Sequence, residues 1–231
     1  KDLLNKKLLE LEGKFDADVI FCLGEIHPGM LRVFRDVIED LKRDAVKRNR
    51  LVIILNTPGG SVETAEKLVD IMRAKYGEVY FVVPDFAMSA GTVFCMSGDK
   101  IFMDYSSSLG PIDPQVFNGK QWVPALGYLN KVDEFLEKER RGELTKAEFL
   151  ILQSQDLAML SSCEQAKALT IALLEKWLVE WKFKDWDKHR TDPVKNGQPV
   201  TQDEKKQRAA EIAEKLGKNT LWHSHGRMIG M

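Results

Sequence analysis

Residues 50–72 read "RLVIILNTPGGSVETAEKLVDIM" and hold the pattern that decides the fold. The run opens with a short, apolar, β-branched segment that predicts a buried strand, and this strand ends in a Pro-Gly-Gly turn. A helix is expected from Val62 to about Lys75, because its apolar residues recur at helical spacing on one face. A buried strand followed directly by an amphipathic helix is typical of a βαβ unit.

The same alternation extends to both sides of this stretch. The other expected elements, in chain order, are a strand at 18–23, an amphipathic helix at about 30–47, a strand at 78–84, a short helix between Ser89 and Gly98, and a strand that begins at Lys100. Strands that alternate with helices at this spacing predict an α/β fold with a mostly parallel sheet over residues of about 15–120.

The sequence pattern predicts helices from Leu126 to about Trp186, and a Pro- and Gly-containing loop follows. Thr201 and Glu204 have the spacing of a capping box, which predicts a helix that runs on to Leu216. We therefore divide the chain into three regions. They are a βαβ-rich core at 1–125, a helical segment at 126–186 that completes the core and serves as an oligomerisation arm, and a loop, helix and His-containing tail at 187–231.

Composition excludes several function classes. The 231 residues carry 34 Lys and Arg against 35 Asp and Glu, so no net field favours nucleic acid or anionic lipid. Three scattered cysteines without CxxC spacing fit a reducing compartment, and we expect a cytoplasmic location. Neither a membrane anchor nor a signal segment is visible, although the chain begins at Lys1, which leaves membrane association through a removed segment open.

Two turns carry the candidate chemistry. "NTPGGSV" at residues 56–62 and "AMSAG" at residues 87–91 each follow a predicted strand and precede a helix. The carboxyl ends of parallel strands meet at one edge of a sheet, where ligands bind in open α/β folds. Gly59 and Gly60 permit positive φ and bring backbone N–H groups close to a ligand. The N–H groups of Gly60 and Ala90, converging beside the Ser89 hydroxyl, would form an oxyanion hole.

The stretches "LNTPGGSVETAEKLVDIM", "AMSAGTVFCMSGDKIFM" and "LGPIDPQ" together resemble the ClpP/crotonase superfamily, over residues of about 18–115. Within it they are most similar to the S49-type branch, which includes signal peptide peptidase A and the serine dehydrogenase proteinases. The resemblance implies that Ser89 is the nucleophile and that the N–H groups of Gly60 and Ala90 form the oxyanion hole. We also expect Gly59 and Met88 to contact substrate. The implied fold is a spiral of βαβ units with a helical arm that packs in homo-oligomers.

The general base is the point at which the sequence departs from the best-known family pattern. ClpP has a histidine immediately before a Gln-Pro pair, whereas this chain has Ile112 and Asp113 in that region. A serine hydroxyl needs a base at neutral pH, so another group must take its proton. Asp113 is one candidate, although it is more suited to orienting another group or to capping the loop.

Two further candidates for the base lie downstream. Signal peptide peptidases use a lysine from a helix, and Lys131 in "GYLNKVDEF" lies in the corresponding stretch. Burial would be needed to make it a base. His225 in the final "LWHSHGRMIGM" is the alternative, because the serine dehydrogenase proteinases also have a histidine near their end. His223 and His225 have no evident third partner, so no metal site is expected.

The sequence thus favours a serine peptidase that forms an acyl-enzyme at Ser89 on a peptide or protein substrate. Two alternatives stay open: a crotonase-type enzyme acting on CoA thioesters, and an inactive pseudo-peptidase that serves as a scaffold. The GxxxxGK[ST] and GxGxxG patterns are absent, so no nucleotide cofactor is expected and any unfoldase would be a separate partner.

Overall fold

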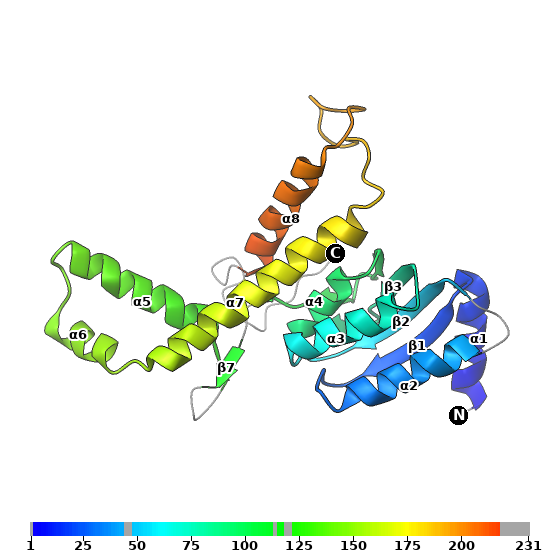
Figure 1. The fold of residues 1–231 in the computed structure, drawn as a ribbon, viewed down its shortest axis with the longest axis horizontal. Helices are drawn as coiled ribbons and strands as arrows, with labels where there is room; N and C mark the ends of the chain where they lie inside the picture. The colour runs from blue at the N-terminus through cyan, green and yellow to red at the C-terminus, as the bar shows by residue number, and fades with distance from the viewer. Residues whose placement is uncertain (1, 44–47, 113–114, 118–121, 218–231) are drawn as a thin grey trace.

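The computed structural model describes residues 2–43, 48–112, 115–117 and 122–217. Its centre is a four-stranded parallel sheet (Figure 1). In their order across the sheet, the strands are β1 (Asp18–Leu23), β2 (Arg50–Asn56), β3 (Glu78–Val82) and β5 (Lys100–Phe102). Every neighbouring pair is parallel, which confirms the predicted α/β fold with a mostly parallel sheet.

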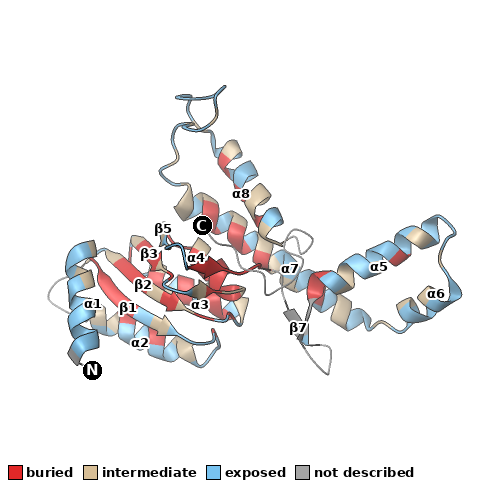
Figure 2. Ribbon diagram, turned by 180° about the vertical axis from the view of Figure 1, so that it is seen from behind, coloured by how far each residue is buried: buried red, intermediate tan, exposed pale blue. Residues whose placement is uncertain are grey.

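Three helices connect these strands and cover one face of the sheet. They are α2 (Met30–Arg43), α3 (Val62–Arg73) and α4 (Ala90–Met96). Their apolar stripes bury Phe34, Leu68 and Phe94 in the main core, together with Ile53 and Phe81 of the sheet. Figure 2 shows this concentration of buried residues along the sheet, α3 and α4. The helical periodicity of the sequence therefore marks the faces that pack on the strands.

The opposite face of the sheet is covered by α1 (Asp2–Phe15), which the sequence pattern did not predict. Leu8, Leu11 and Phe15 pack against a second, smaller cluster around Val19 and Tyr80. Other apolar residues of α1 stay exposed, and this spread around the helix hides the periodic signal.

Two short sheets extend the architecture at the carboxyl end of the strands. β4 (Phe86–Ala87) pairs in parallel with β6 (Ser108–Leu109), and Thr57, just after β2, forms a parallel bridge with Ala87. β7 (Gln115–Phe117) pairs with β8 (Trp122–Pro124) in antiparallel fashion. The β4 bridge places the loops after β2 and β3 side by side.

The second half of the described chain is helical, as the sequence predicts. It contains α5 (Ala125–Arg140), α6 (Lys146–Gln153), α7 (Leu157–Trp177), a π-helical turn (Leu178–Lys182) and α8 (Gln202–Gly217). α5 and α6 form a hairpin, the arm, that projects away from the sheet, and α7 returns toward α4 (Figure 1). The boundaries set at residues 125 and 186 from the sequence stay predictions.

The start of α8 has the capping box expected from the sequence. The N–H of Glu204 donates to Thr201 Oγ1 (3.2 Å), and the N–H of Thr201 donates to Glu204 Oε2 (2.9 Å). These reciprocal bonds satisfy two donors that a helix start would otherwise leave without partners.

One helical stretch, Leu157–Lys182, is long and apolar enough to cross a membrane by length and composition alone. The same test is passed by core helices of soluble proteins, so it is weak evidence for a span. In this structure Leu173, Leu174 and Trp177 of α7 are buried in the main core.

A buried cationic cluster lies where the π-helical turn meets α3 and α4. Arg73 Nη1 donates to Asp99 Oδ2 (3.0 Å), and the Arg73 guanidinium stacks over the Trp181 ring at 4.2 Å from its centre. The amine of Lys182 is buried near these groups and near Cys95, and it has no hydrogen-bond partner among the described residues. Burial lowers the pKa of the Lys182 amine to about 8.

We predict that Lys182→Met stabilises the protein at neutral pH. The pKa of the Lys182 amine in the folded state lies below its unfolded value of 10.5. The buried charge therefore lowers the free energy of unfolding by its full amount below pH 8, and by less and less as the pH rises toward 10.5. Removal of the amine should raise the free energy of unfolding at pH 7 by up to about 3 kcal/mol, the equivalent of that pKa shift. Denaturant unfolding of wild type and variant between pH 6 and pH 10.5 measures the difference, which should shrink as pH rises.

The matched control is Lys176→Met, which replaces an exposed lysine that precedes Lys182 in the same helical stretch. Its effect on unfolding should be small and should not vary with pH in this window. A Lys182→Met effect that is constant with pH would contradict the burial of an unpartnered amine.

Candidate active site

The two glycine- and serine-containing turns meet because β2 continues its pairing beyond Asn56. The N–H of Thr57 donates to Phe86 O (3.1 Å), and the N–H of Met88 donates to Thr57 O (3.0 Å). These bonds hold the segment just before Ser89 against the start of the Pro-Gly-Gly turn. The sequence prediction that both turns share one sheet edge is confirmed by this pairing.

Ser89 has a strained backbone and a hydroxyl that takes no part in helix capping. It occupies the N-cap of α4 with φ 49° and ψ −117°, and within the described chain its side chain makes no capping bond. Ser61 stands at the equivalent place before α3 with φ −78°, and its Oγ accepts the N–H of Thr64 (2.9 Å). Positive φ is costly for a residue with a Cβ and is concentrated at functional sites. Because Ser61 caps its helix and Ser89 does not, the strained conformation of Ser89 indicates a role other than helix capping.

Gly59 allows the two turns to touch. A methyl group added there would lie 2.7 Å from Met88 O and 3.0 Å from Ser89 Cβ, and the residue has φ 105°. Gly60, at φ 140°, is equally constrained, since a methyl group there would lie 2.1 Å from Ile26 O. Only glycine fits either position.

The N–H of Gly60 is aimed by its own peptide plane. The carbonyl of Gly59 accepts the N–H of Ile26 (2.7 Å), and Ile26 O accepts the N–H of Ser61 (2.9 Å). A trans peptide directs its C=O and N–H to opposite sides, so the Gly60 N–H points away from Ile26. Within the described part of the chain, the Gly60 N–H donates no hydrogen bond.

The N–H of Ala90 is aimed by the same rule. The carbonyl of Ser89 accepts the N–H of Val93 (3.2 Å), which turns the Ala90 N–H out of the helix. As a first-turn donor of α4 it has no partner within its helix, nor elsewhere among the described residues. Two N–H groups without a partner among the described residues therefore lie near Ser89, one on the next residue and one on Gly60, which lines the same cleft as Ser89.

Ser89 and Gly60 both line a cleft of about 500 Å³. Its other walls come from the loop after β1, the start of α3, and α7. The lining residues are Glu25, Ile26, His27, Pro28, Pro58, Gly60, Ser61, Val62, Glu63, Ser89, Ile112, Ala166, Leu169 and Thr170. Gly59 and Met88 are not among these residues, and the Met88 side chain lies against Gly110, where an added methyl group would approach Met88 Sδ to 2.6 Å. Their contact with substrate stays a prediction.

The sequence reasoning missed His27, which lines this cleft. Its Nδ1 accepts the N–H of Gly29 (3.1 Å), so the neutral ring carries its proton on Nε2. In this tautomer Nε2 can donate a hydrogen bond and cannot take a proton. The signal was present in "GEIHPGM", because that segment follows the first strand and so ends at the same sheet edge.

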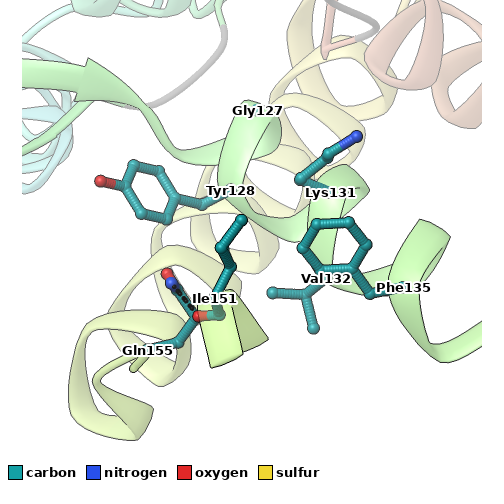
Figure 3. Close-up of a pocket in the computed structure, with 7 residues that line it drawn as sticks. All are labelled: Gly127, Tyr128, Lys131, Val132, Phe135, Ile151 and Gln155. Atoms are coloured by element: carbon teal, nitrogen blue, oxygen red, sulfur yellow. Dashed lines mark hydrogen bonds between the residues drawn. The ribbon is translucent and has the colours of Figure 1, made fainter. Parts of the chain in front are cut away.

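Lys131 lies in α5 and lines a different pocket, of about 400 Å³, between α5 and α6 (Figure 3). Its amine forms an ion pair with Glu134 Oε2 (2.8 Å), and 56% of its side chain is exposed. It thus lacks the burial that a lysine base requires, and the two pockets share no lining residue. A single chain does not bring Lys131 into the Ser89 cleft.

Asp113 and His225 lie outside the described residues, so their assignments stay predictions. Ile112, which precedes Asp113, lines the cleft, and its N–H donates to Leu216 O (3.4 Å) near the end of α8. Within the described ranges, no group of three His, Cys, Asp or Glu residues is placed to hold a metal ion.

The sequence model of one protein family, the ClpP-like SDH-type serine proteinases, matches residues 31–220. The chain belongs to this family. The match covers the two turns, the strained serine and α7, and the family is one of serine proteinases. The resemblance to S49-type peptidases that the motifs indicate is thereby confirmed.

Two curated relatives are uncharacterized proteins of Methanocaldococcus jannaschii. MJ0137 is 40% identical over 74 residues, which are 32% of this chain and 26% of the relative. MJ1495 is 29% identical over 123 residues, which are 53% of this chain and 36% of the relative. The chain thus spans well under half the length of these relatives.

Similar solved structures are also proteases. A lysine-to-alanine mutant of the 1510-N membrane-bound stomatin-specific protease, in complex with a substrate peptide, has TM-score 0.46 and 18% identity over 69% of this chain and 57% of that one. A serine-to-alanine mutant of the same protease has TM-score 0.42 and 20% identity over 67% and 66%. The ClpP protease catalytic domain from Plasmodium falciparum has TM-score 0.34 and 18% identity over 44% and 57%.

The contact between the two turns predicts the effect of Gly59→Ala. The added methyl group would press on Ser89 Cβ and Met88 O, so the serine should be displaced and the fold destabilised by about 1–3 kcal/mol. We expect at least about a tenfold loss in the rate of fluorophosphonate labelling of Ser89, measured by mass spectrometry. Gly13→Ala in α1 is the control, because a methyl group there meets nothing within 4 Å. Unchanged labelling of the Gly59→Ala variant would contradict the packing of the turns.

Proposed function

We propose that this protein is a serine peptidase that cleaves peptides or proteins through an acyl-enzyme at Ser89. The observation that carries the proposal is the strained backbone of Ser89, a residue that lines the cleft. Among the described residues, neither its hydroxyl nor the N–H groups of Gly60 and Ala90 have a hydrogen-bond partner. Membership of a serine proteinase family supports the reaction class. A crotonase-type reaction would use the same N–H groups but would have no need of this serine conformation.

In the proposed mechanism, a base takes the proton of Ser89 Oγ as this oxygen bonds to the carbonyl carbon of the scissile peptide. The carbonyl π electrons move to its oxygen, and the N–H groups of Gly60 and Ala90 donate to the resulting oxyanion. When the intermediate collapses, the C–N bond breaks and the base returns its proton to the leaving amine. Water then attacks the ester carbonyl by the same steps and releases the acid and Ser89.

The cleft fits an extended peptide with apolar side chains near the scissile bond. Its walls carry Ile26, Val62 and Leu169, and the segment at Ile26 already pairs with Gly60 as in a parallel sheet. A peptide laid along such an edge gains backbone hydrogen bonds, while the apolar walls accept its side chains. Endopeptidase action is part of this proposal, and the proposed reaction uses no cofactor.

We further propose that the enzyme acts as a homo-oligomer. The arm leaves the sheet as a hairpin and exposes Phe149, Leu150 and Ile151, which a second copy can cover. An oligomer would also let Lys131 lose its exposure and approach the Ser89 of a neighbouring copy. His225 of the tail is the alternative base.

We also propose a cytoplasmic location for the enzyme. Cys22, Cys95 and Cys163 are unpaired, which supports a reducing, cytoplasmic location. A separate unfoldase would deliver folded proteins if such substrates are used, whereas short peptides would need no such partner.

Ser89→Ala should abolish both fluorophosphonate labelling and turnover of a peptide library, with a loss of at least about a thousandfold. Liquid chromatography with mass spectrometry measures both readouts on the same samples. Ser106→Ala is the control, because this exposed serine lies outside the cleft and should leave labelling and turnover unchanged. Turnover that is equal in wild type and Ser89→Ala would sink the peptidase assignment and favour a scaffold.

Mixing two inactive variants tests whether Lys131 acts between copies. Lys131→Met and Ser89→Ala should each be inactive, whereas co-refolded mixtures should regain peptide turnover, because one copy supplies Lys131 and the other Ser89. Lys67→Met, an exposed ion-paired lysine of α3, should retain activity. If Lys131→Met remains fully active, Lys131 is not the base and the tail variant His225→Ala becomes the decisive measurement.

A further inference from the structure

Thr57 makes contacts to both turns of the site. It is completely buried and directly follows β2. Its backbone N–H donates to Phe86 O (3.1 Å) and its carbonyl accepts the N–H of Met88 (3.0 Å), so it holds the segment that leads to Ser89. Both bonds are made by backbone atoms, so the Thr57 side chain can make further contacts of its own.

The hydroxyl of Thr57 holds the glycine turn. Thr57 Oγ1 accepts the N–H of Gly59 (3.0 Å) and lies 3.4 Å from Gly59 O, to which it donates. Gly59 O belongs to the same planar peptide as the Gly60 N–H. A group that fixes the Gly59 carbonyl therefore fixes the direction of the N–H assigned to the oxyanion hole.

The methyl group of Thr57 contacts the other turn. A methyl group added to Gly91 would lie 2.4 Å from Thr57 Cγ2, so these two residues are in direct contact at the first turn of α4. Gly91 also donates its N–H to Met88 O (2.7 Å) and thereby closes the turn that contains Ser89. The two ends of one small side chain thus contact the two loops that supply the N–H donors.

We propose that Thr57 is a positioning residue that keeps the Gly60 N–H in register with the Ser89 hydroxyl and the Ala90 N–H. The hydroxyl supports the orientation of the Gly60 donor that the N–H of Ile26 also fixes, and the methyl group packs against Gly91 in the serine turn. This inference rests on the proposed function, since it assigns Thr57 to the oxyanion hole of that same site. Thr57 does not line the cleft, so its effect on catalysis is indirect.

Two matched substitutions separate the roles of the side chain. Thr57→Val keeps the shape but removes the hydroxyl, so the Gly59 N–H loses its partner and the Gly59 carbonyl keeps only the bond from Ile26, which leaves the Gly60 donor less firmly oriented. We expect kcat to fall by about ten- to a hundredfold with KM changed less than about threefold, the signature of an interaction made in the transition state. Thr57→Ser keeps the hydroxyl and should retain kcat within about threefold of wild type.

Binding of a peptide boronic acid supplies a readout that a merely structural role would not move. The boronate forms a tetrahedral adduct with Ser89 and places an oxygen in the oxyanion hole, whereas a non-cleaved peptide does not. Affinity for the boronate should fall in Thr57→Val in parallel with kcat, while affinity for the peptide should not. Thermal unfolding of both variants shows that each is folded at the assay temperature.

A second pair of variants tests the methyl contact even if Thr57→Val does not fold. Gly91→Ala should slow fluorophosphonate labelling of Ser89, because its methyl group collides with Thr57 Cγ2. The double variant Gly91→Ala with Thr57→Ser removes that methyl group and should regain most of the labelling rate. Gly127→Ala is the control for Gly91→Ala, because a methyl group there meets nothing within 4 Å; combined with Thr57→Ser it should show no such rescue.

The outcomes separate the two proposals. Equal kcat and boronate affinity in Thr57→Val and Thr57→Ser, with an active wild type, would overturn the role of Thr57 and leave the peptidase intact. Absence of Ser89 labelling and of turnover in wild type would overturn the proposed function and with it the role of Thr57. Failure of Thr57→Ser to rescue Gly91→Ala would overturn the contact that couples the turns.

Discussion

The parallel bridge between Thr57 and Ala87 is the interaction on which the rest of the site depends. It joins the loop after β2 to the loop after β3 at the carboxyl edge of the sheet. Because backbone hydrogen bonds hold this bridge on both sides, the Pro-Gly-Gly turn and the Ser89 turn cannot move independently. This pairing requires glycine at positions 59 and 60, since Gly59 lies against Ser89 Cβ and Gly60 against Ile26 O, with no room for a side chain.

The same constraint explains how a strained serine is tolerated. Positive φ at a non-glycine residue costs roughly 1–3 kcal/mol and persists only where its surroundings hold it. Here the segment before Ser89 is fixed by Thr57, and the residues after it start a helix buried in the main core. Helix α4 and the sheet therefore supply the stability that keeps the Ser89 hydroxyl pointed at the cleft instead of capping the helix, as Ser61 does.

The candidate site is divided between two parts of the chain. The proposed nucleophile and the proposed backbone donors belong to the sheet and its loops, whereas Lys131, a proposed base, belongs to the arm and is exposed and ion-paired. Under the proposed function this division makes reactivity depend on assembly, because an isolated chain would keep its serine without Lys131 as a base. His27 also lines the cleft, and its Nδ1 is already occupied as the acceptor of the Gly29 N–H.

Local sequence alone determined the α/β alternation and the two turns at one sheet edge, because periodicity and glycine placement are local signals. The roles of Ser89 and of the N–H groups of Gly60 and Ala90 stay predictions. The local sequence also located the cap at Thr201. It did not predict α1, whose apolar residues are spread around the helix, or His27, whose role depends on which loops share the cleft. The separation of Lys131 from Ser89 and the coupling by Thr57 were decided by tertiary structure alone, since both depend on distances between segments far apart in the chain.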